Sequence, residues 1–457
     1  MNLLWHRTEQ NLSSIPYRGS ENLYPEFSHW AEHILARLTN RVEFEADLRK
    51  AFPFQIFAHE FEVFDILHVP GRSLKILCRF HENSFRLALS IIQVNFYSEE
   101  TCPKEYWKIK TNATRADCVA LIAGWSAVAR IFPEDSGLPG LAEMLDLKLV
   151  ANLLNDAGAN ADPEGSSWNM LSYQSGKRCA IRYEFSESGT RFFGKIQEGS
   201  KAGITHRYLL KLWHHPARRF QMPKPLAFSS ALGARWETFV EGISLETALQ
   251  TSDMEPLLSE VTSHLVYLHD LSIADLPPTT PEMIMARITR KILRRMHSLV
   301  PKLAVRAEKI ITTLHEKLSW TSNSPQVTLH GDFHIANFLI NDKGLVFIDL
   351  DNLSKGDPCC DLALFGSRLI LRNLHHNDRL AETLDLVSRL PELYATLSGR
   401  MIRQETFAWY IAALLIGRQI KSCMRVDAPD KERMIAIMLA WAEDCLIHGR
   451  FRGELPA

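Results

Sequence analysis

The sequence predicts an α+β protein, and three observations support that class. Residues 64–96 and 169–197 contain apolar stretches interrupted by Gly- or Pro-containing turns, which predicts antiparallel strands. Residues 327–348 contain two further short apolar runs joined by a turn. From residue 245 onward, apolar residues recur mostly at helical spacing. We therefore expect small antiparallel sheets followed by a largely helical region.

Length and composition set broad limits on function. The 457 residues suffice for two or three domains, and 46% hydrophobic and 23% charged residues are ordinary for a globular protein. A formal net charge of −1 gives no indication of a nucleic-acid or anionic-membrane partner. We find no signal-peptide core and no apolar run of membrane-spanning length. Eight scattered cysteines without metal-site spacing indicate reduced thiols, so we expect a cytoplasmic protein of undetermined oligomeric state.

The first 160 residues form a predicted accessory region. Helical spacing appears over 27–37 and 42–52, followed by a hairpin over 64–80 and a strand over 89–96. A turn-rich connector follows at 131–141, and the small, polar run 157–166 is the expected domain boundary. Residues 169–185 and 191–197 resemble the earlier hairpin and strand at a shift of 105, which suggests a degenerate repeat or two unrelated hairpins. The matching pairs are Gly71/Gly176, Arg72/Lys177, Ile76/Ile181 and Phe80/Phe185.

The most informative stretch is 327–363. Apolar residues lead into His330, Gly331 and Asp332, and Asn337 follows five positions after Asp332. A second apolar run leads directly to Asp349, and the turn at 341–344 predicts a tight hairpin between the two runs. Two carboxylates and one amide are therefore expected at strand ends that the hairpin brings together.

This set of side chains suits phosphoryl transfer. That reaction needs a base to orient the attacking hydroxyl and cations to neutralise the phosphate oxygens. Asp332 is the candidate base, and Asn337 and Asp349 are candidate oxygen ligands for Mg²⁺. An alternative is a hydrolase metal site of His330, Asp332 and His334, which would leave Asn337 and Asp349 without roles. Another is a plain strand–turn–strand with Asp residues at its turns.

The pattern H-G-D-x-x-x-x-N, then Asp349, then Gly356-Asp-Pro-x-x-Asp361-Leu-Ala, resembles the aminoglycoside phosphotransferase and choline kinase family of protein-kinase-like enzymes. The resemblance implies a bilobal fold, with a small nucleotide-binding lobe at 161–241 and a large helical lobe at 242–457 carrying the catalytic loop. It implies ATP and Mg²⁺ as cofactors and a small-molecule hydroxyl as the acceptor, of aminoglycoside, sugar or amino-alcohol type. His330 and Asp361 would support the site, and Asp361 would bond amides near a helix start and brace the catalytic loop.

The resemblance also implies a nucleotide site. It would comprise the turn residues Ser175, Gly176 and Lys177, the strand residue Lys195, and the interlobe hinge Glu237, Thr238, Phe239 and Val240. A lysine flanked by apolar strand residues is costly without an anionic partner, and ATP phosphate is one candidate. The alternative is that the side chain extends along the apolar surface to place its charge in solvent. The sequence departs from the kinase pattern because the next predicted helix, 203–213, has no acid to hold that lysine. Glu184 and Glu198 are the nearest substitutes.

Later patterns predict further helices, at 245–250, 254–271, 282–320, 360–374, 378–397, 401–425 and 430–448. The basic run of Arg287, Arg290, Lys291, Arg294 and Arg295 is expected to be a solvated helix face. We therefore expect an ATP- and Mg²⁺-dependent small-molecule kinase. The alternatives are a catalytically silent nucleotide-binding regulator, which the missing helix acid favours, and a protein kinase, which Gly331 and the short segment after Asp349 disfavour.

Overall fold

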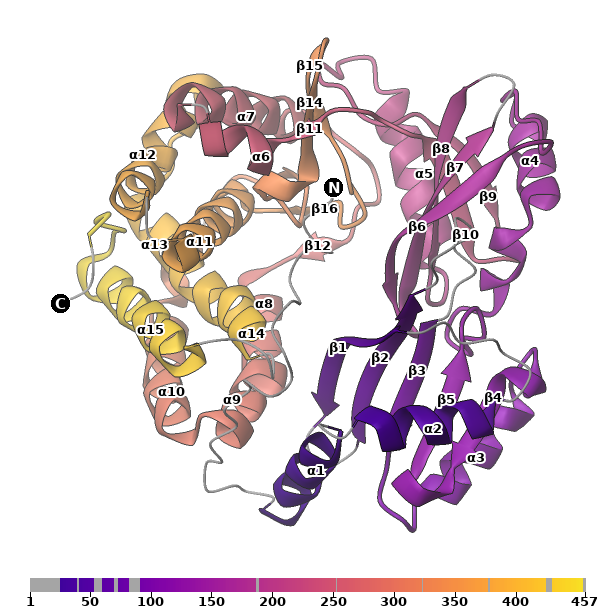
Figure 1. Cartoon of the computed structure of the whole chain (residues 1–457). Coiled ribbons are helices and arrows are strands. Elements are labelled where there is room, and N and C mark those ends of the chain that lie inside the picture. Colours follow the sequence, from indigo (N-terminus) through magenta and orange to yellow (C-terminus); the bar gives the residue numbers. More distant parts are fainter. Residues whose placement is uncertain are drawn as a thin grey trace. The chain divides into compact units, whose positions relative to one another are not determined.

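The structure is a computed structural model. It describes residues 25–38, 41–52, 60–69, 73–81, 91–185, 189–251, 253–322, 324–376, 379–424 and 430–454. These residues form two compact units (Figure 1). The first contains the described residues up to Gly203 together with Leu226–Glu237. The second contains Ile204–Pro225, Thr238–Met424 and the described residues from 430 onward.

The first unit begins with a five-stranded sheet in the order β1-β2-β3-β5-β4. Its core joins the helix side chain Phe44 to Phe96 and Trp125, with 4.8 Å between the ring centroids of Phe44 and Trp125. The elements are α1 (Pro25–Arg37), α2 (Arg41–Ala51), β1 (Glu60–Val69), β2 (Ser73–His81), β3 (Ile91–Phe96), α3 (Cys102–Thr111), β4 (Val119–Ile122) and β5 (Ala127–Ile131).

A second five-stranded sheet in the same unit has the order β6-β7-β8-β10-β9. Its core contains the buried aromatic side chains Tyr183, Phe185 and Trp236. The elements are α4 (Leu147–Asp156), β6 (Ser167–Gln174), β7 (Arg178–Phe185), β8 (Thr190–Gln197), β9 (Pro225–Ser229) and β10 (Ala234–Thr238), and α5 (Lys201–Trp213) follows β8 in the chain.

The two sheets have the same strand order, and a helix lies between the third and fourth strands of each in the chain. Val69 pairs with Ser73 in the first hairpin and Gln174 with Arg178 in the second, a shift of 105 in both cases. Gly71 and Arg72, two residues of the predicted repeat, lie outside the described residues. The common strand order nevertheless extends the similarity from one hairpin to the whole sheet.

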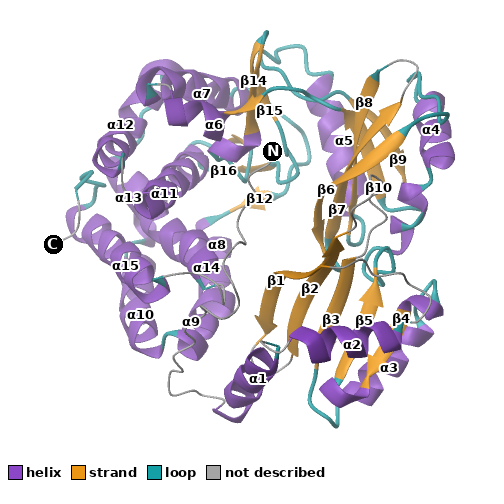
Figure 2. Ribbon diagram, in the orientation of Figure 1, coloured by secondary structure: helices purple, strands orange, loops and turns teal. Residues whose placement is uncertain are grey.

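The second unit is mainly helical (Figure 2). Two small sheets have the orders β11-β14-β15 and β12-β16-β13. Their strands are β11 (Ile243–Ser244), β12 (Pro278–Thr279), β13 (Val327–Leu329), β14 (Phe338–Asn341), β15 (Gly344–Phe347) and β16 (Ser354–Gly356). The α-helices are α6 (Leu245–Thr251), α7 (Met254–His269), α8 (Pro281–Arg287), α9 (Arg294–Leu299), α10 (Pro301–Glu316), α11 (Pro358–His376), α12 (Leu380–Ser398), α13 (Gln404–Leu414), α14 (Lys421–Cys423) and α15 (Lys431–His448). The α+β class is thus confirmed.

The predicted single helix over 282–320 is wrong in its continuity. A π-helical turn, η6 (Ile288–Leu293), separates α8 from α9. Val300 then leaves helical geometry, and α10 begins at Pro301. Proline lacks the amide hydrogen that a helix interior requires but is well suited to the first helical position. A second π-helical turn, η9 (Leu415–Ile420), interrupts the predicted helix over 401–425.

Two whole-chain expectations can be compared with the structure. All eight cysteines are unpaired and buried, in agreement with the prediction of reduced thiols. Among the described helices, none has both the length and the apolar character needed to cross a membrane.

Candidate active site

The hairpin β14–β15 positions the predicted metal-ligand residues. Phe338 pairs with Phe347 at one end of the hairpin, and Asn341 pairs with Gly344 at the turn. The carbonyl of Asn337 accepts a hydrogen bond of 2.9 Å from the amide of Ile348, the residue before Asp349. Asn337 and Asp349 therefore lie at the same end of the hairpin, as the turn chemistry of the sequence predicts.

A buried carboxylate holds the loop that carries Asp332. Asp361, in the first turn of α11, accepts hydrogen bonds from the amides of His330 (2.7 Å) and Gly331 (3.0 Å). Nε2 of the buried His269 lies 3.3 Å from the same carboxylate. Gly331 has a φ of +74°, and a Cβ built there would lie 2.0 Å from the carbonyl oxygen of Asn352. This loop conformation therefore requires glycine.

The expectation that Asp361 bonds amides at the helix start is wrong in one respect. The helix-start amide of Cys359 donates instead to Asp357 Oδ1, at 2.8 Å. Because Asp357 satisfies the start of α11, the Asp361 carboxylate binds the amides of the loop.

Asp332 has one carboxylate oxygen that lacks a donor. Its Oδ1 is buried and accepts no hydrogen bond from any described residue, while Arg418 Nη1 lies 3.9 Å away. Its Oδ2 lies 3.8 Å from His334 Nε2. Burial raises the pKa of Asp332, but the neighbouring His334 and the positive charges of Arg418 and Arg368 outweigh it and hold that pKa well below its ordinary value. Asp332 is therefore an ionised acceptor at neutral pH.

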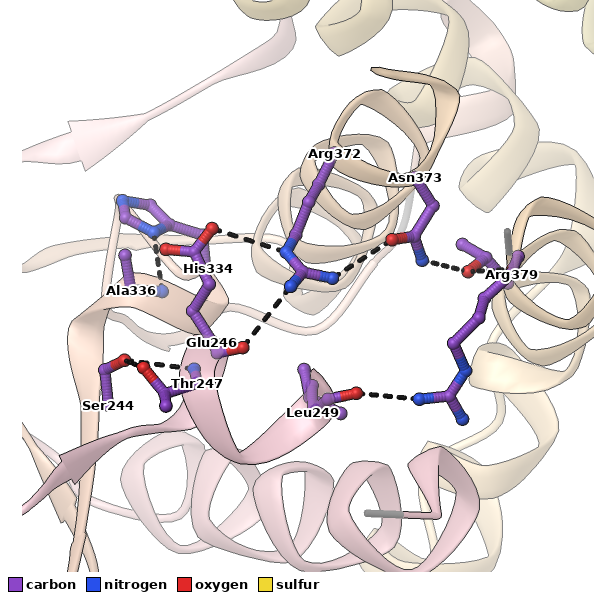
Figure 3. Close-up of polar contacts among 10 residues, drawn as sticks. Ser244, Glu246, Thr247, Leu249, His334, Ala336, Arg372, Asn373 and Arg379 are labelled. Atoms are coloured by element: carbon purple, nitrogen blue, oxygen red, sulfur yellow. Dashed lines mark hydrogen bonds and ion pairs between the residues drawn. The ribbon is translucent and has the colours of Figure 1, made fainter. Parts of the chain in front are cut away.

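His334 is oriented by a local hydrogen bond. Its Nδ1 accepts from the amide of Ala336, with 3.3 Å between the nitrogens (Figure 3). A neutral ring that accepts at Nδ1 carries its hydrogen on Nε2, which is the nitrogen nearer Asp332. His334 thus presents an N–H to the candidate base.

Asn337 and Asp349 fit a small hard cation. The buried Asn337 donates through Nδ2 to the carbonyl of Asp332 at 2.8 Å, which leaves its Oδ1 for another partner. Asp349 is half-buried with a φ of +55°. An amide oxygen and a carboxylate suit Mg²⁺, which usually retains water and phosphate ligands in addition to one or two protein ligands. Within the described ranges, no group of three or more His, Cys, Asp and Glu side chains could hold a metal ion by itself.

Helix α6 is fixed beside this loop by arginines from α11 and from the start of α12 (Figure 3). Arg372 Nε lies 3.3 Å from Glu246 Oε1, and Arg372 Nη2 donates to the Glu246 carbonyl at 3.3 Å. Arg379 Nη1 donates to the Leu249 carbonyl at 2.7 Å. Because α6 packs against the turn at Ile335–Asn337, these contacts support the end of the hairpin that carries Asn337.

In the first unit, the predicted phosphate-binding turn is held by a residue that the sequence analysis missed. Gly176 has a φ of +73°, and its amide donates to Asp135 Oδ2 at 2.7 Å. Ser175 is buried, and Lys177 is exposed. Asp135 lies 41 residues earlier, in the predicted connector, where no local pattern marks it.

Lys195 is buried on β8, opposite Ala180 of β7. Of the two acids proposed as its partners, Glu184 forms an ion pair with Arg191 at 3.1 Å, and Glu198 is exposed. Helix α5 contains no acidic residue, as its sequence requires.

The predicted hinge residues span the boundary between the units, which falls between Glu237 and Thr238. The buried Glu237 carboxylate accepts from Arg235 Nη1 at 2.5 Å. Thr238 Oγ1 accepts from the amide of Lys224 at 2.9 Å. Phe239 and Val240 are half-buried.

The solvated basic face predicted near residue 290 is wrong for Arg287 and Arg295. Arg290, Lys291 and Arg294 are exposed, whereas Arg287 and Arg295 are half-buried, and Arg295 Nη2 donates to the Met424 carbonyl at 2.8 Å. The reason is the π-helical turn at Ile288–Leu293, whose wider repeat breaks the spacing that would keep the run on one helix face. Arg368 and Arg418, whose positive charges act on Asp332, were given no role in the sequence analysis.

Asp332, Asn337 and Asp349 thus lie on one loop and hairpin of the second unit. Residues 182–376, which include this loop, match the model of the phosphotransferase enzyme family. The resemblance predicted from the motifs is therefore confirmed. No curated protein matches the sequence.

Three of the similar solved structures are small-molecule kinases. Aminoglycoside phosphotransferase APH(3'')-Id of Streptomyces rimosus is 18% identical, with 60% of this chain and 99% of that chain covered and a TM-score of 0.41. The amicoumacin kinase hAmiN, bound to AMP-PNP, Ca²⁺ and Ami, is 14% identical. The match covers 66% of this chain and 93% of that chain, with a TM-score of 0.47. An ethanolamine kinase of Plasmodium vivax is 11% identical, with 66% of this chain and 88% of that chain covered and a TM-score of 0.47. Similarities of this size leave the acceptor of this chain open.

Proposed function

We propose that the protein transfers the γ-phosphoryl group of ATP to a hydroxyl of a small molecule, with Mg²⁺ as the cation. The observation that carries the proposal is Asp332 Oδ1, a buried and ionised carboxylate oxygen that accepts no hydrogen bond from a described residue. An acceptor hydroxyl donating to this atom would satisfy it and would be oriented for attack.

Each of the predicted site residues would have a separate role in this reaction. Asp332 accepts the hydroxyl proton as the hydroxyl oxygen attacks the γ-phosphorus and the bond to the β–γ bridging oxygen breaks, releasing ADP. Asn337 and Asp349 would hold the cation, which would supply charge neutralisation to the phosphate oxygens. Asp361 fixes the loop through the amides of His330 and Gly331. Lys195, Ser175, Gly176, Lys177 and the hinge 237–240 are proposed to meet the nucleotide.

The test is ADP release by purified protein supplied with MgATP and a panel of hydroxylated acceptors, with Asp332→Asn as the inactive reference. We expect at least one acceptor to give ADP release and a matching phosphorylated product with the wild-type protein and not with Asp332→Asn. A wild-type protein that binds MgATP but phosphorylates no acceptor would instead favour the silent-regulator alternative.

A further inference from the structure

Three arginines from three separate elements interact electrostatically with Asp332. Arg287 ends α8, Arg368 lies in α11, and Arg418 lies in the π-helical turn η9. Arg418 Nη1 lies 3.9 Å from Asp332 Oδ1, and its Nη2 donates to the Gly331 carbonyl at 3.4 Å. All three arginine residues are half-buried.

Packing contacts hold the backbones of these arginines together. Gln419 Nε2 donates to Ser367 Oγ at 2.9 Å, which joins η9 to α11 at the residues adjacent to Arg418 and Arg368. A Cβ built on Gly417 would lie 3.0 Å from Ile288 Cγ1, so η9 also packs closely where Arg287 ends its helix. Each arginine therefore lies one residue from a contact that fixes its element against a neighbour.

The positive charges of this cluster are incompletely balanced. Arg287 and Arg368 form no ion pair or hydrogen bond with a described residue, and Nε of Arg368 is buried without a partner among them. Burial lowers the pKa of both, and the charge of Arg418 lowers it further, while Asp332 opposes both effects. The nearby Asp361 carboxylate already accepts from two amides and faces His269. Partly desolvated cations without partners are costly, so an anionic group is expected at this position.

The position of the arginines indicates that the expected anionic group belongs to the acceptor molecule. Asn337 and Asp349, the candidate nucleotide-side groups, lie at the end of the β14–β15 hairpin. The arginines instead come from helical elements, and Arg418 Nη1 lies 3.9 Å from the carboxylate of the candidate base. A molecule whose hydroxyl reaches Asp332 Oδ1 would bring its neighbouring substituents towards them.

We propose that the acceptor is an alcohol bearing a carboxylate or phosphate group, and that Arg287, Arg368 and Arg418 bind this group while Asp332 accepts the hydroxyl proton. Guanidinium groups match the planar oxygens of both anions. The same charges repel the ammonium groups of aminoglycosides and amino alcohols, two of the acceptor types that the family resemblance implies. This inference rests on the proposed phosphotransferase function and narrows its substrate class.

The test uses matched acceptors in the ADP-release assay. Glucose is compared with gluconate and glucose 6-phosphate, glycerol with glycerate and glycerol 3-phosphate, and streptomycin represents polycations. We expect kcat/KM for the preferred anionic member to exceed that of its neutral parent at least ten-fold, and the carboxylate and phosphate members distinguish the two anion types. Preference for a neutral or cationic acceptor would overturn this inference while leaving the phosphotransferase function intact.

Two variants test the arginines directly. Arg368→Gln and Arg418→Gln should each raise KM for the anionic acceptor at least ten-fold, change KM for ATP less than two-fold, and reduce the preference for anionic over neutral acceptors. Arg290→Gln, in the exposed part of the same basic run as Arg287, is the matched control and should resemble the wild type. A rise in KM for ATP instead would place the arginines on the nucleotide and overturn the proposal.

A binding measurement separates the inference from the catalytic function. If no acceptor is phosphorylated, the phosphotransferase proposal fails, and calorimetric titration with gluconate and glucose 6-phosphate then decides the arginine site alone. Binding at least ten-fold weaker in Arg368→Gln than in the wild type supports the site. Failure of both anions to bind the wild-type protein overturns it.

Discussion

Asp135 Oδ2 accepts a hydrogen bond of 2.7 Å from the amide of Gly176, at the tip of the turn proposed to bind nucleotide phosphates. The same oxygen accepts from the Tyr173 hydroxyl at 2.7 Å, and Oδ1 accepts from the Gly137 amide at 3.0 Å. A Cβ on Gly137 would lie 2.6 Å from Gly176 Cα, so the two backbones are in close contact. Asp135 and Gly137, which lie in the predicted connector, thus support the turn that is predicted to bind phosphate.

Asp135→Asn is therefore expected to destabilise the first unit. Three donors meet a buried carboxylate, and the amide oxygen of Asn can replace only part of that acceptor capacity. Hydrogen bonds to charged groups contribute roughly 1.5–3 kcal/mol each to the free energy of unfolding. We therefore expect the melting temperature to fall by roughly 3–8 °C. KM for ATP should rise because the turn loses its support. Asp156→Asn, at the exposed end of α4, is the control, and an unchanged melting temperature for Asp135→Asn would contradict the assigned role.

The local parts of this architecture could be predicted from the sequence. The hairpin that joins Asn337 to Asp349 was predictable because both apolar runs and the turn at 341–344 lie within a short segment. The contact between Asp135 and Gly176 was not, because 41 residues separate the partners and neither lies in a periodic pattern. Arg418 and Gly331 are 87 residues apart, and their proximity depends on a π-helical turn that propensity does not reveal. The break at Pro301, by contrast, had a visible signal in the proline itself.

Asp332→Asn should reduce turnover by roughly a thousand-fold, which is within the usual contribution of a general base. Binding of MgATP should remain close to normal because Asp332 orients the acceptor rather than the nucleotide. Steady-state kinetics and calorimetry measure the two quantities separately. The exposed hairpin residue Asp342, changed to Asn, serves as the control. Collapse of nucleotide affinity with turnover preserved at saturating ATP would show that the role is misassigned.

Asp349→Ala should weaken binding of MgATP much more than binding of metal-free ATP. We expect the affinity for MgATP to fall by roughly 10- to 100-fold, because the cation loses a charged ligand. Asn337 would be left as the remaining protein ligand at that end of the hairpin. Calorimetric titration with ATP in the presence and absence of Mg²⁺ gives both affinities. Asp342→Ala is the control, and equal losses for the two forms would count against Asp349 as a cation ligand.

Lys195→Ala should raise KM for ATP roughly 10- to 100-fold, as expected for a lost charge-assisted hydrogen bond, and should lower turnover. Lys195→Arg should rescue only in part because a planar guanidinium does not match a site that holds an ammonium group. Lys201→Ala, at the exposed start of α5, is the matched control. Wild-type KM and turnover in Lys195→Ala would remove this residue from the nucleotide site.

His330 gives a pH dependence of stability whose sign follows from its burial. The ring is fully buried beside Phe333 and Phe347, with centroids 5.9 and 5.6 Å away, and burial lowers its pKa below the ordinary 6.5. The folded protein therefore keeps the ring neutral where the unfolded chain already binds a proton. Because the unfolded state binds more protons in that window, the free energy of unfolding falls as the pH drops below about 6.5, by at most about 1.4 kcal/mol per pH unit.

Replacing this ring by an apolar one tests that sign. His330→Phe keeps the backbone amide that donates to Asp361 and removes the titrating group. Urea unfolding of the wild type should lose roughly 1 kcal/mol more than the variant between pH 6.5 and 5.5. Between pH 7.5 and 8.5 the difference between the two proteins should stay constant, since neither state of His330 binds a proton there. Parallel acid losses in both proteins would mean that His330 is protonated in the folded state and that its burial does not set its charge.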